Sequence, residues 1–321
     1  MGPGTRPSTV YAYLNMTASQ PLVSVGLPTF NRADRLRRAI DSVLSQDYAS
    51  LELIICDNAS SDGTQHMCEE YARQDSRIVY RRQATNCGMH ENFKRAFAES
   101  HGAFFMWMGD DDWLDRNYLS SCSRILLQHA DHELVVGRGR YFIDGNHAFD
   151  EDPIDLLDTS ACERVLSYYR TVGINGMFYG LMRREMVAHT KIDNVFGGDW
   201  LFLARIAFQG KARTLEAVAI NRSTDGASGD LEQLARQVGV SRVLVKKPLL
   251  AVAYSAFRDI AWRSPIYSSL SRRSRFALGL RAAEIIGDRY VWTALRSKLI
   301  IRTRLKRCIR RLQSIWTLPA Q

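Results

Sequence analysis

One apolar run that ends in acidic residues constrains the fold of this chain more than any other stretch. Phe104–Met108 are five large apolar residues, and Gly109 separates them from the three acids Asp110–Asp112. A short, continuous apolar run bounded by glycine is typical of a strand buried on both faces, as in a parallel α/β sheet. Ligands of such sheets bind beyond the carboxyl ends of the strands, so we expect these acids to line a site.

Two interpretations of Asp110–Asp112 are open at this point. Adjacent carboxylates repel one another and lose hydration, so a positive group should compensate their charge. An oxygen-preferring divalent cation, Mg²⁺ or Mn²⁺, would do so, and such a cation usually carries the phosphates of a substrate. The alternative is that the acids only cap the helix that follows them.

The net charge and the cysteine spacing limit which classes of protein this chain can belong to. The formal net charge is +9, but from Ile266 to the end there are 13 Lys and Arg against two acids, so the preceding part is close to neutral. The six Cys form no CxxC pair and have no metal-finger spacing, which indicates reduced thiols in a cytoplasmic protein. Neither a bilayer-spanning apolar stretch nor a signal peptide is expected.

The first half of the chain alternates between apolar runs of strand length and amphipathic segments of helix length. This β-α-β-α order with short loops predicts a parallel, doubly wound sheet. The expected strands are Leu22–Pro28, Leu51–Cys56, Arg77–Arg81 and Phe104–Met108, with Leu134–Gly137 and Tyr141–Ile143 as candidates for further strands. The expected helices run from Asn31 or Asp34 to Gln46, from Thr64 to Arg73, and from Glu91 to Ser100.

The loops after these strands carry no glycine-rich phosphate motif. Neither GxGxxG nor GxxxxGK[ST] follows the first strand, so neither a dinucleotide site of the usual kind nor a P-loop is predicted. Two strands end in acids instead, at Asp57 and at Asp110–Asp112. A nucleotide would therefore be held by side chains and a metal ion.

Several spaced motifs, from about Pro21 to Ser228, together resemble glycosyltransferase family 2, the inverting nucleotide-sugar transferases of the GT-A fold. The matching segments are Val23–Arg32, Ser42–Gln46, Glu52–Thr64, Asn86–Gly88, Asn92, Asp110–Asp112 and Gly198–Trp200. The resemblance implies a Rossmann-like, mostly parallel sheet flanked by helices. We expect a flexible leader over residues 1–20, a GT-A catalytic domain over 21–230, and a basic helical C-terminal extension over 231–321.

The resemblance assigns the nucleoside to the loops after the first two strands. Pro28, Thr29 and Phe30 would line the base and ribose, and Asp57 would accept a hydrogen bond from the base. A carboxylate at a buried strand end needs a donor, which agrees with this role for Asp57. Asp62, in the same loop, is expected to cap the next helix rather than to contact a ligand.

Other residues are candidates for the diphosphate and the donor sugar. By resemblance these are Arg82, Asn86 and Asn92, although Arg82 can equally be an ordinary exposed arginine. Arg222 resembles a late loop that closes over the donor phosphates. The family often has a histidine two residues later, where this chain has Thr224, so a metal ligand from this loop is in doubt.

The acidic run matches the metal motif of the family, which is usually Asp-X-Asp-Asp. Gly109 takes the first position here. We expect Asp111 on the metal with Asp112 supporting it, and Asp110 directed to the ribose or the metal. The resemblance favours Mg²⁺ or Mn²⁺ acting as a Lewis acid on the leaving nucleotide.

An inverting transferase needs a base that takes the proton of the acceptor hydroxyl. The family places an aspartate before an aromatic residue, and Asp199 before Trp200 matches this pattern. Gly198 stands where a further acid is common. The alternative is that Asp199 is the N-cap of the next helix, and both roles are compatible.

The end of the chain predicts a basic amphipathic helix over Val291–Trp316. Such a helix suits an anionic membrane surface. It could also pack on the catalytic domain with a solvated basic face. A nucleic-acid partner is not expected, because no recognition motif accompanies the charge.

Together these features predict a metal-dependent, inverting transfer of a sugar from a nucleoside-diphosphate sugar to a hydroxyl of a glycan or lipid-linked acceptor, in surface polysaccharide assembly. The expected location is the cytoplasm, with peripheral attachment at the inner face of the membrane. One alternative is a non-catalytic glycan- or lipid-binding relative. Another is a sugar-1-phosphate nucleotidyltransferase, although that class would carry a glycine-rich loop near Pro28.

Overall fold

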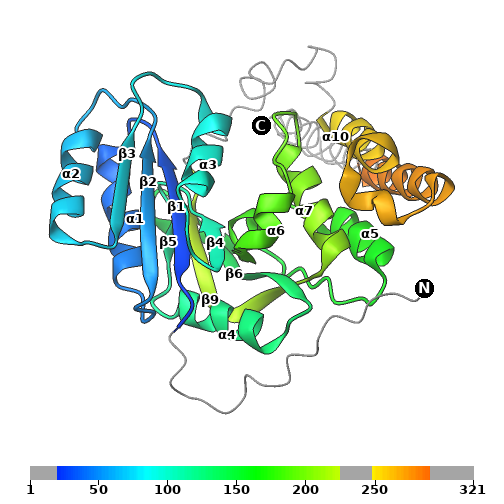
Figure 1. Ribbon diagram of the computed structural model, residues 1–321, viewed down its shortest axis with the longest axis horizontal. Helices are drawn as coiled ribbons and strands as arrows, with labels where there is room; N and C mark the ends of the chain where they lie inside the picture. The colour runs from blue at the N-terminus through cyan, green and yellow to red at the C-terminus, as the bar shows by residue number, and fades with distance from the viewer. Residues whose placement is uncertain (1–19, 225–247, 290–321) are drawn as a thin grey trace, which may run out of the picture.

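The computed structural model describes residues 20–224 and 248–289 and contains a nine-stranded mixed sheet (Figure 1). The strand order is β3-β2-β1-β4-β8-β6-β9-β5, and β7 pairs with β6 outside this path. The strands are β1 (Val23–Thr29), β2 (Leu51–Asp57), β3 (Ile78–Arg82), β4 (Phe104–Trp107), β5 (Trp113–Leu114), β6 (His132–Ile143), β7 (Asn146–Asp150), β8 (Leu181–Arg183) and β9 (Lys211–Ser223).

The predicted parallel half of the sheet is confirmed. β1 pairs in parallel with both β2 and β4, and β2 pairs in parallel with β3. Helices α1 (Ala33–Leu44), α2 (Thr64–Gln74) and α3 (Met89–Ala98) connect these strands in the expected order. The carboxyl ends of β1, β2 and β4 therefore lie side by side at one edge of the sheet.

The second half of the sheet differs from the prediction. The two candidate strands over Leu134–Gly137 and Tyr141–Ile143 are one strand, β6, which pairs with β9 along its length through a register shift after Gly137. The glycines and arginines of 137–140 look like a break in the sequence, but pairing with β9 keeps them extended. β8 is antiparallel to both β4 and β6, so β4 and β6 run in the same direction.

The two faces of the sheet are covered by different helices (Figure 1). In β4, Phe104 and Met106 face the core shared with α1 and α4 (Tyr118–Gln128), whereas Phe105 and Trp107 face the other core. Trp107 is buried there and stacks on Phe178, with ring centroids 5.2 Å apart. This alternation explains why the run is apolar without interruption.

The remaining helices cover the Trp107 face. They are α5 (Ala161–Thr171), α6 (Arg184–His189), α7 (Gly198–Gln209), α10 (Pro248–Arg258) and a helix over 272–289, with short turns at Gly176–Tyr179, Asp259–Arg263 and Pro265–Ser269. The C-terminal helices share this core through Val252, Ala256 and Ile260. Arg205 of α7 is buried and pairs with the carboxylates of Asp259 and Asp193, which ties the predicted C-terminal extension to the catalytic part. The predicted tail helix over Val291–Trp316 lies outside the described residues.

Candidate active site

The carboxyl ends of β1 and β2 are joined by one buried amide. Asn92 Nδ2 of α3 donates to the carbonyl oxygens of Cys56 at 2.8 Å and Thr29 at 3.4 Å. Its Oδ1 is buried and accepts no hydrogen bond within the described part of the chain. Of the residues predicted to line the nucleoside, Pro28 and Thr29 are buried at the end of β1, and Phe30 is exposed. The structure thus gathers these residues at one edge of the sheet.

Asp57 is fully buried and has its donors inside the protein. Oδ1 accepts from the amide of Ser60 at 2.8 Å, and Oδ2 accepts from the hydroxyl of Tyr80 at 2.8 Å. Arg82 Nε lies 3.7 Å from Oδ2, and the Arg82 guanidinium also donates to the carbonyl of Ser60. The expected contact of Asp57 with a base stays a prediction, and its visible role is to order the loop after β2.

Asn86 belongs to a second ordered loop. Its Oδ1 accepts from Asn58 Nδ2 at 2.8 Å and from the amide of Gly88 at 2.9 Å. Gly88 has φ +84°, a conformation that favours glycine, and α3 begins directly after it. This bridge sets the two loops side by side, next to the end of β1.

The carboxylates of Asp110–Asp112 point to different partners. Asp110 Oδ2 accepts from the Thr29 hydroxyl at 2.8 Å. Asp112 is paired with Arg222, whose Nε lies 3.2 Å from Oδ2. Asp111 Oδ2 is buried and accepts no hydrogen bond from any described residue; the nearest cation, Arg35, has its NH1 3.9 Å away. Among the three acids, Asp111 is therefore the one whose carboxylate most needs a further positive partner.

Gly109 permits this arrangement. The amide of Asp112 donates to the carbonyl of Gly109 at 3.2 Å, so the run folds back on itself. A Cβ at position 109 would lie 2.7 Å from Asp112 Oδ2. The departure from Asp-X-Asp-Asp thus makes room for the Asp112 carboxylate beside Arg222.

Burial changes the acidity of two of these groups. It raises the pKa of Asp110 to about 6, opposed by the hydrogen bond from Thr29. It raises the pKa of Asp112 to about 6 as well, opposed by the charge of Arg222. Ionisation of both carboxylates at neutral pH therefore lowers the free energy of unfolding, as is common in sites built for a ligand.

Arg222, predicted to contact phosphates, is held on three sides. Besides Asp112, its NH1 donates to the Tyr141 hydroxyl at 3.0 Å. Its guanidinium carbon lies 4.2 Å from the ring centroid of Tyr179. Burial raises the pKa of Tyr179 to about 12; the charge of Arg222 opposes this, and the charges of Asp112, Asp199 and Asp111 add to it. Tyr179 thus lies near enough to both the acidic run and Asp199 for their charges to affect its acidity.

Asp199 lies in the first turn of α7 and is half-buried. Asn175 Nδ2 donates to its Oδ2 at 2.5 Å, and the Tyr168 hydroxyl donates to Asn175 Oδ1 at 2.9 Å. Burial raises the pKa of Asp199, and the hydrogen bond from Asn175 opposes the rise. A carboxylate whose pKa is raised accepts a proton more readily than an ordinary exposed aspartate.

The alternative role of Asp199 as an N-cap is wrong, because Gly197, with φ +74°, is the N-cap of α7. Gly198 stands where the family often has an acid. A Cβ at this position would overlap the carbonyl oxygen of Asp193. The local backbone therefore leaves no room for that acid.

Sequence reasoning missed a chain of groups that links Arg222 to Asn175. The Tyr141 hydroxyl donates to Glu151 Oε2 at 3.3 Å, and Glu151 Oε1 accepts from the amide of Gly176 at 3.2 Å. Burial raises the pKa of Glu151. The Asn175-Gly176 pair is a turn signal that could have drawn attention to this loop, but nothing in the sequence relates it to Glu151.

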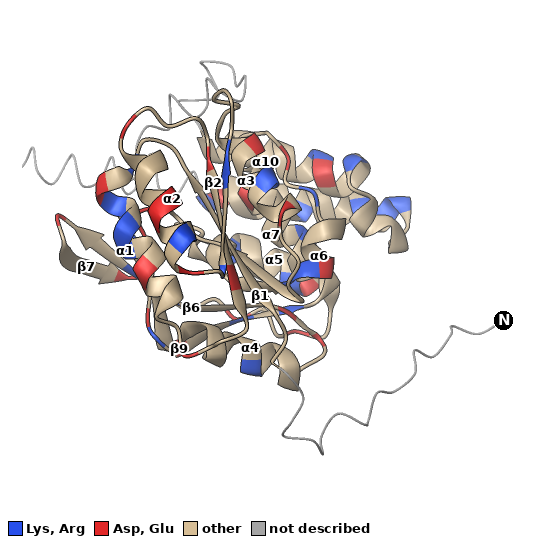
Figure 2. Ribbon diagram, turned by 60° about the vertical axis from the view of Figure 1, so that its left-hand side comes forward, with Lys and Arg blue, Asp and Glu red and all other residues tan. Residues whose placement is uncertain are grey.

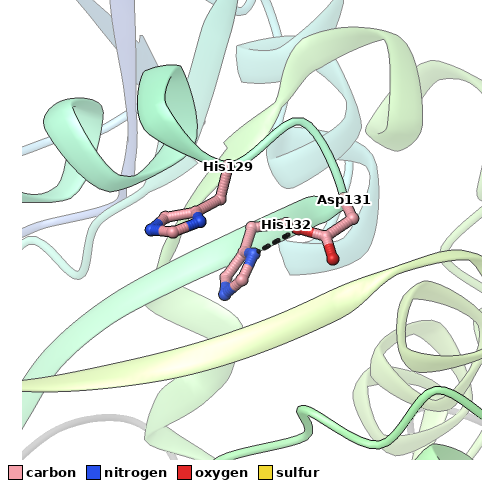
Figure 3. Close-up of side chains that lie close together, drawn as sticks. All are labelled: His129, Asp131 and His132. Carbon is pink, nitrogen blue, oxygen red and sulfur yellow. Dashed lines mark hydrogen bonds and ion pairs between the residues drawn. The ribbon is translucent and has the colours of Figure 1, made fainter.

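Within the described ranges, one group of at least three His, Cys, Asp or Glu has ligand atoms within 4.8 Å of one another: His129, Asp131 and His132 (Figure 3). His132 begins β6, which runs in the direction of β4, so this group lies at the opposite edge of the sheet from Asp111. Lys211 Nζ lies 2.6 Å from Asp131 Oδ2 and supplies this carboxylate with a cation. The group is thus separate from the predicted metal site.

Comparison with known proteins gives a consistent result. The profile described as "Glycosyl transferase family 2" matches residues 24–190. The GalNAc(5)-diNAcBac-PP-undecaprenol beta-1,3-glucosyltransferase of Campylobacter jejuni is 28% identical over 56% of this chain and 57% of its own length. The putative colanic acid biosynthesis glycosyl transferase WcaA of Escherichia coli is 31% identical over 50% of this chain and 57% of its own length.

The fold also resembles solved structures. TarS 1–349 of S. aureus in complex with UDP-GlcNAc superposes with a TM-score of 0.53 at 16% identity, covering 84% of this chain and 82% of that one. The mannosyltransferase PcManGT of Pyrobaculum calidifontis, in complex with GDP-Man and Mn²⁺, gives a TM-score of 0.55 at 16% identity, covering 93% of this chain and 83% of that one. These likenesses establish the fold.

Two further facts bound the comparison. This chain spans little more than half the length of the two curated relatives above, and 18% of Glycosyltransferase GlyA of Streptococcus pneumoniae. None of the helices in 20–224 and 248–289 combines the length and apolar character needed to cross a membrane.

Proposed function

The chain belongs to glycosyl transferase family 2, and from this premise we propose that it transfers a sugar from a nucleoside-diphosphate sugar to an acceptor hydroxyl with inversion. The observation that carries the proposal is that Tyr179 packs against Arg222, the partner of Asp112, while the charges of Asp112, Asp199 and Asp111 all raise its pKa. The acidic run and Asp199 are therefore both near Tyr179, so a donor held at the acidic run would have a base nearby.

The donor nucleotide is proposed to bind where β1 and β2 end. Pro28, Thr29 and Phe30 would contact the nucleoside, and Asp57 would keep the adjoining loop in shape. Arg82, Asn86 and Asn92 follow on the side of the diphosphate. TarS and PcManGT were solved with UDP-GlcNAc and with GDP-Man, which supports a nucleotide-sugar donor without naming its base.

A divalent cation, Mg²⁺ or Mn²⁺, fits the acidic run. Asp111 would be its first ligand, because its buried Oδ2 accepts no hydrogen bond from the described residues. Asp110, which accepts from the Thr29 hydroxyl, and Asp112 would support it. When bound, the cation would neutralise charge on the leaving diphosphate. Arg222 can then exchange Asp112 for a phosphate oxygen, since both accept a charge-assisted hydrogen bond.

The proton would move to Asp199. Asn175 occupies Oδ2, so Oδ1 is the oxygen we assign to the acceptor proton. As the acceptor oxygen forms its bond to the anomeric carbon, the bond to the diphosphate breaks and the proton passes to Asp199. The nucleoside diphosphate leaves with the electron pair of the broken bond.

The acceptor is proposed to be a glycan or a lipid-linked saccharide in polysaccharide assembly. The printed names of two relatives, one acting on an undecaprenol diphosphate and one in colanic acid biosynthesis, support this class. Such an acceptor agrees with a cytoplasmic protein that attaches to the membrane periphery.

The decisive test separates binding from chemistry. UDP, GDP and dTDP are titrated calorimetrically with and without Mn²⁺, and transfer from the donor that binds is followed in Asp199→Asn. We expect this variant to bind nucleotide like the wild type and to lose transfer by about 100-fold or more. Asp47→Asn, an exposed acid, is the matched control.

The outcomes distinguish the alternatives. Full transfer by Asp199→Asn contradicts the base, and a product with retained anomeric configuration contradicts inversion. Absence of nucleotide binding in the wild type favours a non-catalytic glycan- or lipid-binding relative. Release of pyrophosphate from a nucleoside triphosphate and a sugar 1-phosphate favours a nucleotidyltransferase.

A further inference from the structure

The C-terminal helices expose a continuous apolar patch, made of Tyr254, Phe257, Trp262, Phe276 and Leu280. Trp262 is 61% exposed, Tyr254 58% and Leu280 56%. The rings of Phe257 and Trp262 are 4.9 Å apart between centroids, and those of Phe257 and Phe276 are 5.4 Å apart. Large apolar side chains that gather on a surface in this way mark an interaction site.

The patch spans two helices that are packed closely together. Phe257 belongs to α10, and Phe276 and Leu280 lie on successive turns of the helix over 272–289. At Gly279 a Cβ would lie 3.2 Å from Phe257 Cδ2, so the glycine lets the helices approach. The apolar patch is therefore one surface.

The opposite side of these helices is committed to the protein core. Ala256, Ile260 and Ala282 are buried there. Asp259 is also buried, where it pairs with Arg205. These contacts fix the helices to α7, beside which they lie (Figure 1). Packing against the core therefore does not explain the large apolar side chains on the exposed side of these helices.

Exposed arginines lie on the same helices and turns as the apolar patch. Exposed arginines follow or flank its members at Arg258, Arg263, Arg272, Arg273 and Arg281. Over 248–289 the acids are Asp259, which is buried, Glu284, which pairs with Arg281, and Asp288. Figure 2 shows the basic segments on these helices. The patch and its rim together therefore fit an anionic surface.

We propose that this surface binds an anionic phospholipid membrane. Trp and Tyr side chains place an apolar body and a polar tip at the boundary between headgroups and acyl chains, and arginines contact lipid phosphates. A two-fold contact with a second copy would bring the arginine rims of both copies together, which like-charge repulsion disfavours. The proposal is independent of the predicted tail helix and of the catalytic assignment.

The experiment measures partition of the full chain onto vesicles of phosphatidylcholine alone and of phosphatidylcholine with phosphatidylglycerol. We expect binding to the anionic vesicles, weakened about 10-fold or more in Trp262→Ser/Phe276→Ser. Arg272→Gln/Arg273→Gln leaves the apolar residues intact and should weaken binding about 25-fold, at roughly 1 kcal/mol for each arginine. The control, Leu127→Ser/Arg124→Gln, alters exposed residues on α4 and should bind like the wild type.

A second measurement guards against misfolded variants. Brominated lipids should quench the fluorescence of the wild type, and the loss of quenching in Trp262→Phe identifies this side chain in the bilayer. Unchanged partition in both double variants overturns the proposal, as does equal binding to neutral vesicles. A lipid-free dimer that Trp262→Ser/Phe276→Ser abolishes would also overturn it and would assign the patch to a protein partner.

Discussion

Asn175 holds Asp199 from a left-handed backbone conformation, with φ +64° and a 2.5 Å hydrogen bond from Nδ2 to Oδ2. Few residues other than glycine and asparagine adopt this conformation readily. The position therefore requires a residue that tolerates the backbone and also carries an amide. This combination places the donor where the base needs it.

Asn175→Gly keeps the backbone and removes the amide. Because the hydrogen bond lowers the pKa of Asp199 against the effect of burial, its loss should raise that pKa further. The base acts when ionised, so the acidic limb of the kcat–pH profile should move to higher pH, with kcat falling about 10- to 100-fold. Pre-steady-state or steady-state transfer over pH 5 to 9 measures both effects. An unmoved acidic limb would remove Asn175 from this role.

Asp110→Asn should stabilise the ligand-free protein at neutral pH. The folded pKa of Asp110, about 6, is above its ordinary value of 3.8, so the folded form binds the proton more tightly and loses stability as pH rises between these values. The gain in unfolding free energy should be about 1 to 3 kcal/mol at pH 7.5 and should vanish below pH 4. Urea unfolding at several pH values measures it, with Asp47→Asn, a substitution of an exposed acid, as the control.

Asp111→Asn tests which group binds the metal. We expect the apparent affinity for Mn²⁺ in the presence of nucleotide to fall about 10-fold or more, with nucleotide binding in EDTA unchanged. Asp131→Asn is the matched control, because Asp131 lies with His129 and His132 at the other edge of the sheet. If Asp131→Asn is the variant that loses Mn²⁺, the metal assignment to the acidic run is wrong.

The link from Arg222 through Tyr141 and Glu151 to the Gly176 amide predicts coupling between donor and base. Tyr141→Phe removes the hydroxyl that joins Arg222 to Glu151. We expect it to raise the KM for the donor and, combined with Asn175→Gly, to give a non-additive loss of about 1 kcal/mol in kcat/KM. Combination with Asp47→Asn provides the additive reference. Strict additivity in both pairs would mean that Glu151 only supports the loop.

The sequence predicts the parts of this molecule that depend on local pattern. The apolar runs ending at Asp57 and Asp110 identify buried parallel strands, and their order predicts that their carboxyl ends meet. Asp57 finds two of its partners, Tyr80 and Arg82, on the next strand of the sheet. The space at Gly109 and Gly198 is limited by nearby atoms of Asp112 and Asp193, whose positions depend on how the backbone folds. Gly109 and Gly198 are visible in the sequence only as departures from a motif, whereas the structure shows the oxygen atoms that a larger residue would displace.

The roles of Asn175 and Glu151 could not be predicted from the sequence, because they depend on contacts between segments that are far apart along the chain. Glu151 acts on the Gly176 amide and the Tyr141 hydroxyl, which belong to a different loop and to β6. β6 itself was predicted as two pieces, because pairing with β9 overrides the local preference of residues 137–140. Periodicity carries no information about which loops a long strand brings together.

Helix α7 carries Asp199 in its first turn and Arg205 near its middle. Arg205 forms an ion pair with Asp259. Asp259 begins the turn that follows α10, one of the helices that carry the apolar patch. The Asp259–Arg205 pair and α7 thus connect the helices of the apolar patch with the proposed base. If the patch lies on a bilayer, the membrane fixes the distance and the orientation of the active site relative to the surface. An acceptor would then have to reach Asp199 at that distance from the membrane.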